Sequence, residues 1–135
     1  MLYFAYGSNL NFFQIKRRCK DCKYIKSISL KNYILTFRSK YRAADIEKKK
    51  NSIVVGGLFD ISKCDEKRLD IYEDFPSLYK KMYFKYYGKK VMTYIMKKKT
   101  PFRYPAERYL NVIVQGYKDC KLDKRYLNKA LKPSW

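Results

Sequence analysis

The chain has 135 residues, of which 32 are lysine or arginine and 12 are aspartate or glutamate, so its formal net charge is +20. This length favours one domain with a modest core over two catalytic domains. The sequence contains no histidine, which excludes Ser-His-Asp and Cys-His catalysis, histidine metal sites and imidazole bases. Any chemistry must therefore use carboxylate, hydroxyl, amine, thiol or backbone amide groups.

The composition is that of a folded, basic protein. Hydrophobic residues make up 47% of the chain, with 15 tyrosines and 8 phenylalanines, so we expect one globular domain over residues 1–135. Lysines interleaved with aromatic residues can bind phosphates and stack on bases, or they can form a solvated coat. We favour the coat, because the runs Lys48–Lys50 and Lys97–Lys99 fall where turns are expected.

Two features bear on compartment and metal binding. No basic leader precedes a long apolar segment, and no run approaches the roughly 18 apolar residues of a membrane span, so we predict a cytoplasmic protein. Cys19 and Cys22 form a C-x-x-C pair, whereas Cys64 and Cys120 stand alone. A four-cysteine zinc site would need a second pair. We therefore expect reduced thiols, with a zinc or redox role for the pair as the alternative.

The N-terminal segment predicts a strand, a tight turn and a helix. The apolar run Leu2–Tyr6 indicates a buried strand. Gly7-Ser8-Asn9 interrupts it with residues that favour turns and helix caps, and Leu10–Arg18 has helical spacing. Backbone N–H groups at such a junction can bind a carboxylate or an oxyanion. The alternative is an N-capped turn with no ligand.

The middle of the chain predicts strands and one helix. Ile28–Arg38 indicates one or two strands, and the lysine-rich segment Ser39–Asn51 a polar loop. A further strand is expected over Ile53–Ile61, in which Gly56-Gly57 indicates a bulge or a close approach of backbone or ligand. Ser62 and Asp65 resemble a capping box that opens a helix reaching about Tyr72.

The C-terminal half predicts a hairpin and two helices. Pro76 cannot continue the preceding helix, so Glu73–Pro76 is expected to be a helix exit or loop. The remaining predicted elements are strands over Tyr79–Tyr87 and Lys90–Met96 joined at Gly88-Lys89, a helix from Pro105 to about Gly116 with Tyr109, Val112 and Ile113 facing inward, and a helix over Asp123–Leu131. The whole reads as an α+β fold with mostly antiparallel strands.

The residues themselves suggest a base and several pocket groups. Glu73 lies among apolar neighbours just before Pro76, where desolvation would raise its pKa and make it a better base. The alternative is a solvated glutamate at a helix end. The tyrosines of interest are Tyr6, Tyr79, Tyr94 and Tyr109. Each could donate a hydrogen bond into a pocket, or it could simply pack as a half-buried ring.

Two separated motifs together carry a resemblance to a known family. Tyr3–Leu10, with the sequence YFAYGSNL, resembles the opening motif of the γ-glutamylcyclotransferase-like family. Leu69–Tyr79, with the sequence LDIYEDFPSLY, resembles its companion motif, except that Asp74 stands where the family commonly has glycine. Smaller similarities extend the resemblance over nearly the whole chain, at Val55–Phe59, Val91–Met96 and Tyr109–Tyr117.

The resemblance implies a fold and a reaction. The fold would be a compact, mostly antiparallel β-barrel flanked by helices. The reaction would cyclise a small-molecule γ-glutamyl amine or amino acid to 5-oxoproline and release the amine, with Glu73 as general acid and base. The resemblance assigns the substrate-binding residues as Tyr6, Gly7, Ser8, Asn9, Leu10, Tyr79, Tyr94 and Tyr109.

Such chemistry needs no metal and no organic cofactor, because the substrate's own amine is the nucleophile. The sequence does not decide which γ-glutamyl compound is used, nor the oligomeric state. The alternative function is a non-catalytic protein of the same fold that binds nucleic acid or another polyanion through its basic, tyrosine-rich surface.

Overall fold

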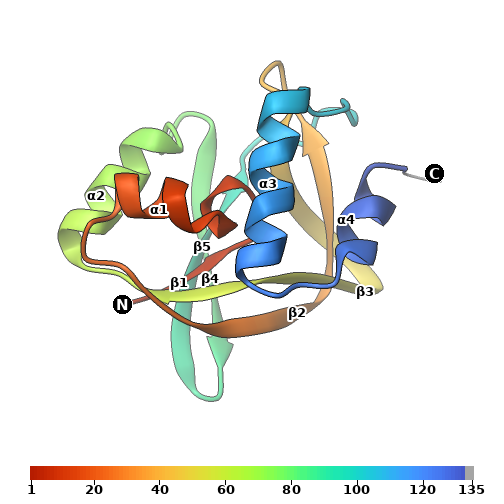
Figure 1. The fold of residues 1–135 in the computed structure, drawn as a ribbon. Coiled ribbons are helices and arrows are strands. Elements are labelled where there is room, and N and C mark those ends of the chain that lie inside the picture. The colour runs from red at the N-terminus through yellow and green to blue at the C-terminus, as the bar shows by residue number, and fades with distance from the viewer. Residues whose placement is uncertain (133–135) are drawn as a thin grey trace.

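The computed structural model describes residues 1–132. In chain order (Figure 1) the elements are β1 (Leu2–Ala5), the 3-10 turn η1 (Ser8–Leu10), α1 (Phe12–Arg18), β2 (Lys23–Arg38), β3 (Ala43–Asp60), α2 (Lys63–Tyr72), β4 (Tyr79–Tyr86), β5 (Lys89–Met96), α3 (Glu107–Asp119) and α4 (Lys124–Ala130).

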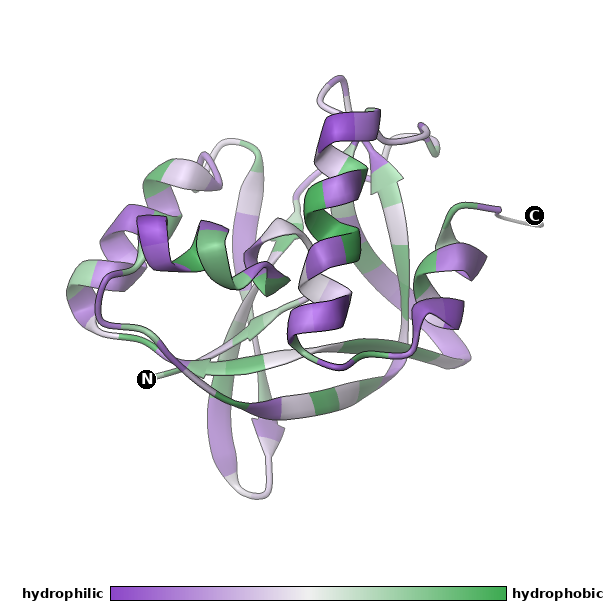
Figure 2. Ribbon diagram, viewed as in Figure 1, coloured by the Kyte–Doolittle hydropathy of each residue, from purple (hydrophilic) through white to green (hydrophobic). Residues whose placement is uncertain are grey.

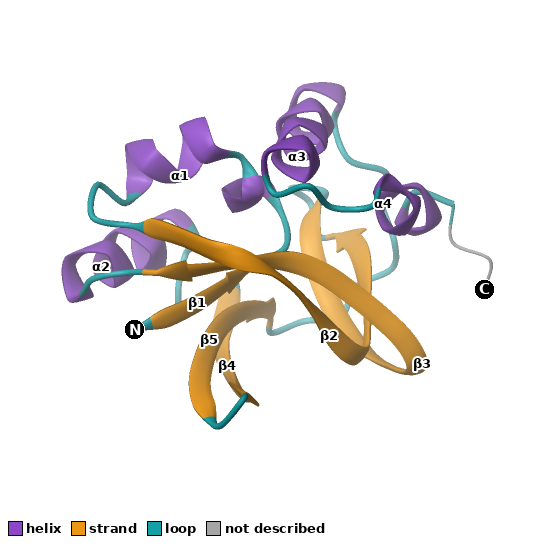
Figure 3. Ribbon diagram, turned by 60° about the horizontal axis from the view of Figure 1, so that its bottom comes forward, coloured by secondary structure: helices purple, strands orange, loops and turns teal. Residues whose placement is uncertain are grey.

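The five strands form one sheet in the order β2-β3-β1-β5-β4. β1 pairs parallel with β5, and the other neighbouring strands are antiparallel, which confirms the α+β class and the mostly antiparallel strands. The predicted barrel is not closed, since within residues 1–132 β2 and β4 are the two edge strands of a strongly curved sheet and do not pair with each other. The long β2–β3 hairpin packs against α4 (Figure 3).

The β2–β3 hairpin is longer than the sequence predicts. The expected loop over Ser39–Asn51 is wrong, because the turn ends at Arg42 and β3 begins at Ala43. Ala44, Asp45 and Ile46 are buried at the start of β3, while the run Lys48–Lys50 keeps its side chains exposed within the same strand. This lysine run therefore lies in a strand and not at a loop tip.

The capping of the first helices differs between α1 and α2. Asn11, not Ser8 or Asn9, is the N-cap of α1, and its Oδ1 accepts from the Gln14 N–H at 3.1 Å. Ser8 and Asn9 belong to η1, so the Asn9 side chain is available for other contacts. α2 has the predicted capping box at its N-terminus.

Two glycines allow elements to approach closely around the N-terminal motif. A Cβ on Gly56 would lie 2.3 Å from the Ala5 carbonyl oxygen, so the predicted close approach of backbone at this strand is confirmed. A Cβ on Gly116 would lie 2.6 Å from the Leu10 Cβ. α3 continues past Gly116 to Asp119 because this glycine is a contact point with η1 and not a helix end.

Hydrophobic and hydrophilic residues alternate along the helices and strands, as the mixed colouring of α3 illustrates (Figure 2). Each element therefore turns an apolar side toward a common core. Among residues 1–132, no helix is both long and apolar enough to cross a bilayer.

Candidate active site

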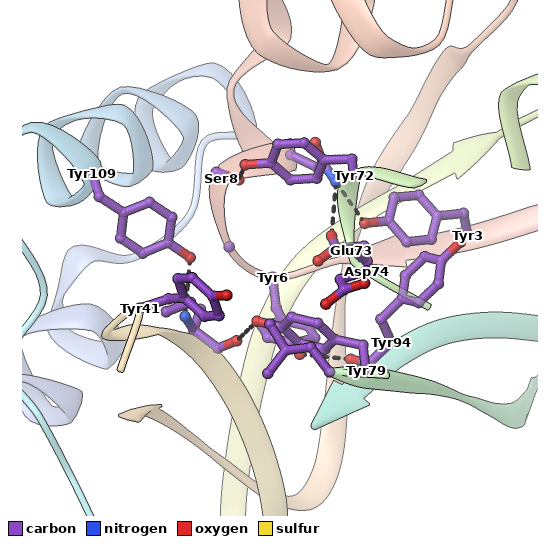
Figure 4. Close-up of a pocket in the computed structure, with 15 residues that line it drawn as sticks. Tyr3, Tyr6, Ser8, Tyr41, Tyr72, Glu73, Asp74, Tyr79, Tyr94 and Tyr109 are labelled. Carbon is purple, nitrogen blue, oxygen red and sulfur yellow. Dashed lines mark hydrogen bonds between the residues drawn. The ribbon is translucent and has the colours of Figure 1, made fainter. Parts of the chain in front are cut away.

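Both motifs meet at a cavity of about 320 Å³ (Figure 4). This volume suits a small molecule. The lining comes from β1, η1, the β2–β3 hairpin, the end of α2, β4, β5 and α3, and consists of Tyr3, Tyr6, Gly7, Ser8, Asn9, Tyr41, Ala43, Ala44, Tyr72, Glu73, Asp74, Leu78, Tyr79, Tyr94 and Tyr109.

Glu73 lies immediately after α2 and is held by a hydrogen bond from its N–H to the Leu69 carbonyl oxygen at 2.8 Å. The side chain is half-buried, and its Oε1 accepts from Asn9 Nδ2 at 3.4 Å. Removal from water raises the pKa of Glu73 to about 7, and the positive charge of Arg18 acts in the opposite direction. A carboxyl group with this pKa can both accept and donate a proton near neutral pH.

The Gly7-Ser8-Asn9 segment forms the part of the lining next to Glu73, which Asn9 contacts. Ser8 and Asn9 begin η1, so their backbone N–H groups have no acceptor within that turn. A Cβ on Gly7 would lie 3.1 Å from the Ala44 Cβ and 3.6 Å from the Tyr109 hydroxyl. The missing side chain therefore keeps room beside the pocket wall.

Three of the predicted tyrosines donate their hydroxyl protons to the protein. Tyr6 donates to the Tyr94 carbonyl oxygen at 2.6 Å, and Tyr79 donates to the Ala44 carbonyl oxygen at 2.5 Å. Tyr94 donates to Asp70 Oδ1 at 2.5 Å. Burial raises the pKa of all three hydroxyls. Because these protons are used within the protein, the three hydroxyls offer the pocket neutral oxygen acceptors and not donors.

The hydroxyls of Tyr109 and Tyr3 accept hydrogen bonds from the protein. The Tyr109 hydroxyl accepts from the Ala44 N–H at 3.0 Å, and the Tyr3 hydroxyl accepts from Asn9 Nδ2 at 3.0 Å. Burial raises the pKa of both hydroxyls, so each keeps a proton. Neither of these two hydrogen bonds uses the tyrosine's own proton, so both hydroxyls can donate into the pocket.

Most of the predicted site residues line the cavity, and Leu10 is the exception. Leu10 is fully buried in the core and packs where α3 crosses η1. Lining residues that the sequence reasoning missed are Tyr3, Tyr41, Ala43, Ala44, Tyr72, Asp74 and Leu78. Tyr72 and Asp74 flank Glu73 and could have been found from that position. Tyr41 lies in the segment expected to be a polar loop, where no periodicity pointed inward.

A family model described as "Gamma-glutamyl cyclotransferase, AIG2-like" matches residues 3–111. The chain belongs to this family. A search of curated proteins found no match.

Solved structures share this fold. A structure named "Gamma-glutamyl cyclotransferase" superposes with a TM-score of 0.81 at 24% identity, covering 99% of this chain and 88% of the other. The uncharacterized protein loc79017 from Homo sapiens gives 0.80 at 25% identity, covering 98% and 87%. YkqA from Bacillus subtilis gives 0.77 at 23% identity, covering 96% of this chain and 52% of its own length.

Asp74, at the position where the sequence resemblance leads us to expect glycine, has a φ of 50°. This is the left-handed region that glycine adopts without strain and that aspartate tolerates better than most residues. Aspartate therefore fits this turn, and its carboxylate is a second one in the pocket lining.

The cysteine pair lies apart from this cavity. Cys19 and Cys22 are free and buried, and burial raises the pKa of Cys19 to about 12. Such thiols are poor nucleophiles. Within residues 1–132, no group of three or more cysteine or acidic side chains is arranged to hold a metal ion.

Proposed function

We propose that this cyclotransferase-family protein is a cytoplasmic, single-domain enzyme that cyclises a γ-glutamyl amine or amino acid to 5-oxoproline and releases the amine. The observation that carries the proposal is Glu73, a carboxyl group with a pKa of about 7 facing a cavity lined by the Gly7-Ser8-Asn9 turn. The alternative, a polyanion-binding protein, requires no such pocket.

The proposed reaction is intramolecular, which suits a chain without histidine. The substrate's neutral α-amine attacks its own γ-carbonyl carbon, the new nitrogen–carbon bond closes a five-membered ring, and the original amide bond then breaks. Because nucleophile and electrophile belong to one molecule, holding the folded-back conformer supplies much of the rate enhancement. No protein nucleophile and no water molecule are consumed.

Glu73 would carry the one proton that must move. The ionised carboxylate accepts a proton from the attacking nitrogen as the bond forms, and the neutral carboxyl then donates it to the departing nitrogen. A pKa of about 7 makes both directions accessible without a large energetic cost. The nitrogen leaves as a neutral amine and takes a further proton from solvent.

The pocket wall supports the binding of a glutamyl head. The N–H groups at the start of η1 and the Tyr109 hydroxyl are donors suited to a carboxylate or to the developing oxyanion. The hydroxyl oxygens of Tyr6 and Tyr79 are acceptors suited to the α-amine. Donors and acceptors are fixed by protein contacts, so little reorganisation accompanies the reaction.

The test is a panel assay with purified protein. γ-Glutamyl amino acids, γ-glutamyl-lysine isopeptide and glutathione are incubated separately, and 5-oxoproline is measured. We expect turnover of at least one compound, abolished in Glu73→Gln and retained in Glu107→Gln, a glutamate on α3 outside the cavity lining. Turnover that survives in Glu73→Gln would remove Glu73 from the mechanism, and no turnover with any compound would overturn the proposed reaction.

A further inference from the structure

Arg18, the last residue of α1, connects to the site from behind its lining. Its Nη1 donates to Asn9 Oδ1 at 2.6 Å and to Ser8 Oγ at 3.2 Å. Its Cζ lies 3.3 Å from the centroid of the Tyr72 ring, and the Tyr72 hydroxyl lies 3.2 Å from the same Ser8 Oγ. The half-buried guanidinium is therefore fixed by a stacked ring and by two hydrogen bonds.

This arrangement determines which way the Asn9 side-chain amide faces. An arginine offers only hydrogen-bond donors, so it can bind the oxygen of the amide and not the nitrogen. With Oδ1 held by Arg18, Nδ2 is directed at the Tyr3 hydroxyl at 3.0 Å and at Glu73 Oε1 at 3.4 Å. Asn9 is 2% exposed, so water does not compete for its two ends.

The other partners of Asn9 cannot fix that orientation. The Tyr3 hydroxyl can donate or accept, so it fits either end of the amide. Glu73 accepts a hydrogen bond when ionised, but when protonated it can donate one to an amide oxygen. A base that gains and loses a proton in each cycle would therefore allow the amide to flip, whereas the guanidinium keeps its charge throughout.

We propose that Arg18 is a positioning residue that locks the Asn9 amide with its N–H groups toward Glu73, so that the carboxylate is held in one place through both protonation states. The catalytic consequence rests on the proposed cyclotransferase function. Arg18 acts through Asn9 and is not among the cavity-lining residues. The orientation of the amide is a property of the fold and holds whatever the substrate.

The charges around Glu73 lead to a second consequence. The titratable groups beside Glu73 are Tyr3 from β1, Tyr6 just after it, Tyr79 from β4, Tyr94 from β5, Tyr109 from α3, Arg18 from α1 and the carboxylate of Asp74, the next residue in the chain. Burial raises the pKa of each tyrosine, so these hydroxyls stay neutral. Arg18 supplies the positive charge that lowers the pKa of Glu73. Its removal should therefore raise that pKa further.

The first experiment measures the titration of Glu73 directly. The chain has four glutamates, so ¹³Cδ-glutamate labelling gives few NMR signals, and Glu73→Gln assigns the one of interest. We expect Arg18→Gln to titrate about one pH unit above wild type, since a nearby opposite charge shifts a carboxyl pKa by roughly that amount or more. Arg18→Lys should stay close to wild type. Equal titration of wild type and Arg18→Gln would overturn the proposal.

Arg17→Gln is the matched control. Arg17 is the neighbouring residue on α1, carries the same charge, and is exposed above the Phe13 ring at 5.6 Å. We expect the Glu73 titration in Arg17→Gln to match wild type. A shift equal to that of Arg18→Gln would show that net charge, and not this contact, sets the titration. Circular dichroism of each variant establishes that it is folded, and Arg18→Met, which also removes the charge, replaces Arg18→Gln if that variant does not fold.

The second experiment tests whether Arg18 acts through Asn9. The assays are run at a pH where Glu73 is ionised in every variant. We expect Arg18→Gln alone to lower kcat about tenfold relative to wild type. Added to Asn9→Ala, the same substitution should lower kcat less than twofold relative to Asn9→Ala alone. If the two substitutions lowered kcat independently, so that their effects multiplied in the double variant, Arg18 would not act through Asn9. If wild type turns over no γ-glutamyl compound, the proposed function fails, while the NMR titration still decides the role of Arg18.

Discussion

Asp45 and Glu73 are both carboxylates inside the protein, but their partners differ in kind. Asp45 on β3 is fully buried and lies 3.1 Å from Arg38 Nε and 2.9 Å from Lys99 Nζ, and it accepts from the Met96 N–H at 2.8 Å. Glu73 has a neutral amide donor at 3.4 Å. One carboxylate is enclosed by charges and donors, and the other keeps a weak contact and a raised pKa.

The contrast separates a carboxylate that holds the fold together from one that can exchange a proton. A buried charge is tolerated when cations and N–H groups compensate it, and Asp45 thereby ties β3 to the end of β5. The charge of Glu73 is compensated only in part, because the cation Arg18 binds Asn9 and not Glu73 itself. Desolvation then dominates and moves its pKa into the range useful for acid and base catalysis.

The largest expected effect is on turnover. Glu73→Gln should lower kcat/KM for the best γ-glutamyl substrate by about 100-fold or more, because general acid and base catalysis typically contributes that much. Asp45→Asn, assayed at a temperature where it is folded, should stay within about threefold of wild type. Comparable losses in the two variants would contradict the division of roles between these carboxylates.

Asp45→Asn should instead reduce stability. Removing one member of a buried ion pair leaves the other charge uncompensated, and the usual cost is about 3 to 5 kcal/mol. Glu47 also pairs with Arg38 and Lys99 is partly exposed, so we expect a loss of about 3 kcal/mol. Urea denaturation monitored by circular dichroism measures it. A loss below about 1 kcal/mol would show that the ion pairs contribute little.

Glu73→Gln should have the opposite effect on stability, and the effect should depend on pH. At pH 4 both folded and unfolded wild type are largely protonated at this residue, so the variant gains little. Between about pH 4.5 and 7 the folded state retains a proton that the unfolded state has lost, so wild-type stability falls as pH rises.

Above pH 7 the full difference in stability between wild type and Glu73→Gln is expected. The shift from 4.5 to about 7 corresponds to at most about 3 kcal/mol, and the half-buried setting reduces it to about 2 kcal/mol. Urea denaturation at pH 4 and pH 8 compares the two proteins. A gain that is equal at both values would mean that the pKa of Glu73 is not the cause.

The smallest expected effect is at Asp74. Asp74→Gly relieves a left-handed backbone conformation with φ of 50° but gives the unfolded chain more freedom, so stability should change by less than about 1 kcal/mol. The same variant removes a carboxylate beside Glu73, and like charges raise carboxyl pKa values. We expect the Glu73 titration to move to lower pH, which the ¹³C experiment measures. A move to higher pH would contradict this.

The sequence predicted most of the fold because its signals were local. The capping box at Ser62 and Asp65, the break at Pro76 and the cap at Asp123 each act within a few residues. The full length of the β2–β3 hairpin was missed because the lysines of Lys48–Lys50 resemble a polar loop, while the pairing of this part of β3 depends on residues of β2.

The candidate site was predicted unevenly for the same reason. Glu73 and the turn at Gly7 to Asn9 follow from the motifs, but the directions of the tyrosine hydroxyls do not. Whether Tyr6 donates or accepts depends on the Tyr94 carbonyl, 88 residues away. Arg18 was also missed, since nothing in a helix-end arginine indicates that it binds the oxygen of Asn9.

Tyr6, Tyr79 and Tyr94 donate their hydroxyl protons to other groups of the protein. This arrangement also affects product release. A wall of oxygen acceptors favours a nitrogen that carries several protons, as the free amine of a γ-glutamyl compound does. Ring closure leaves that nitrogen as a lactam with a single N–H. In the proposed reaction the product therefore makes fewer hydrogen bonds to these hydroxyls than the substrate does. The hydroxyls that bind the substrate thus favour release of 5-oxoproline.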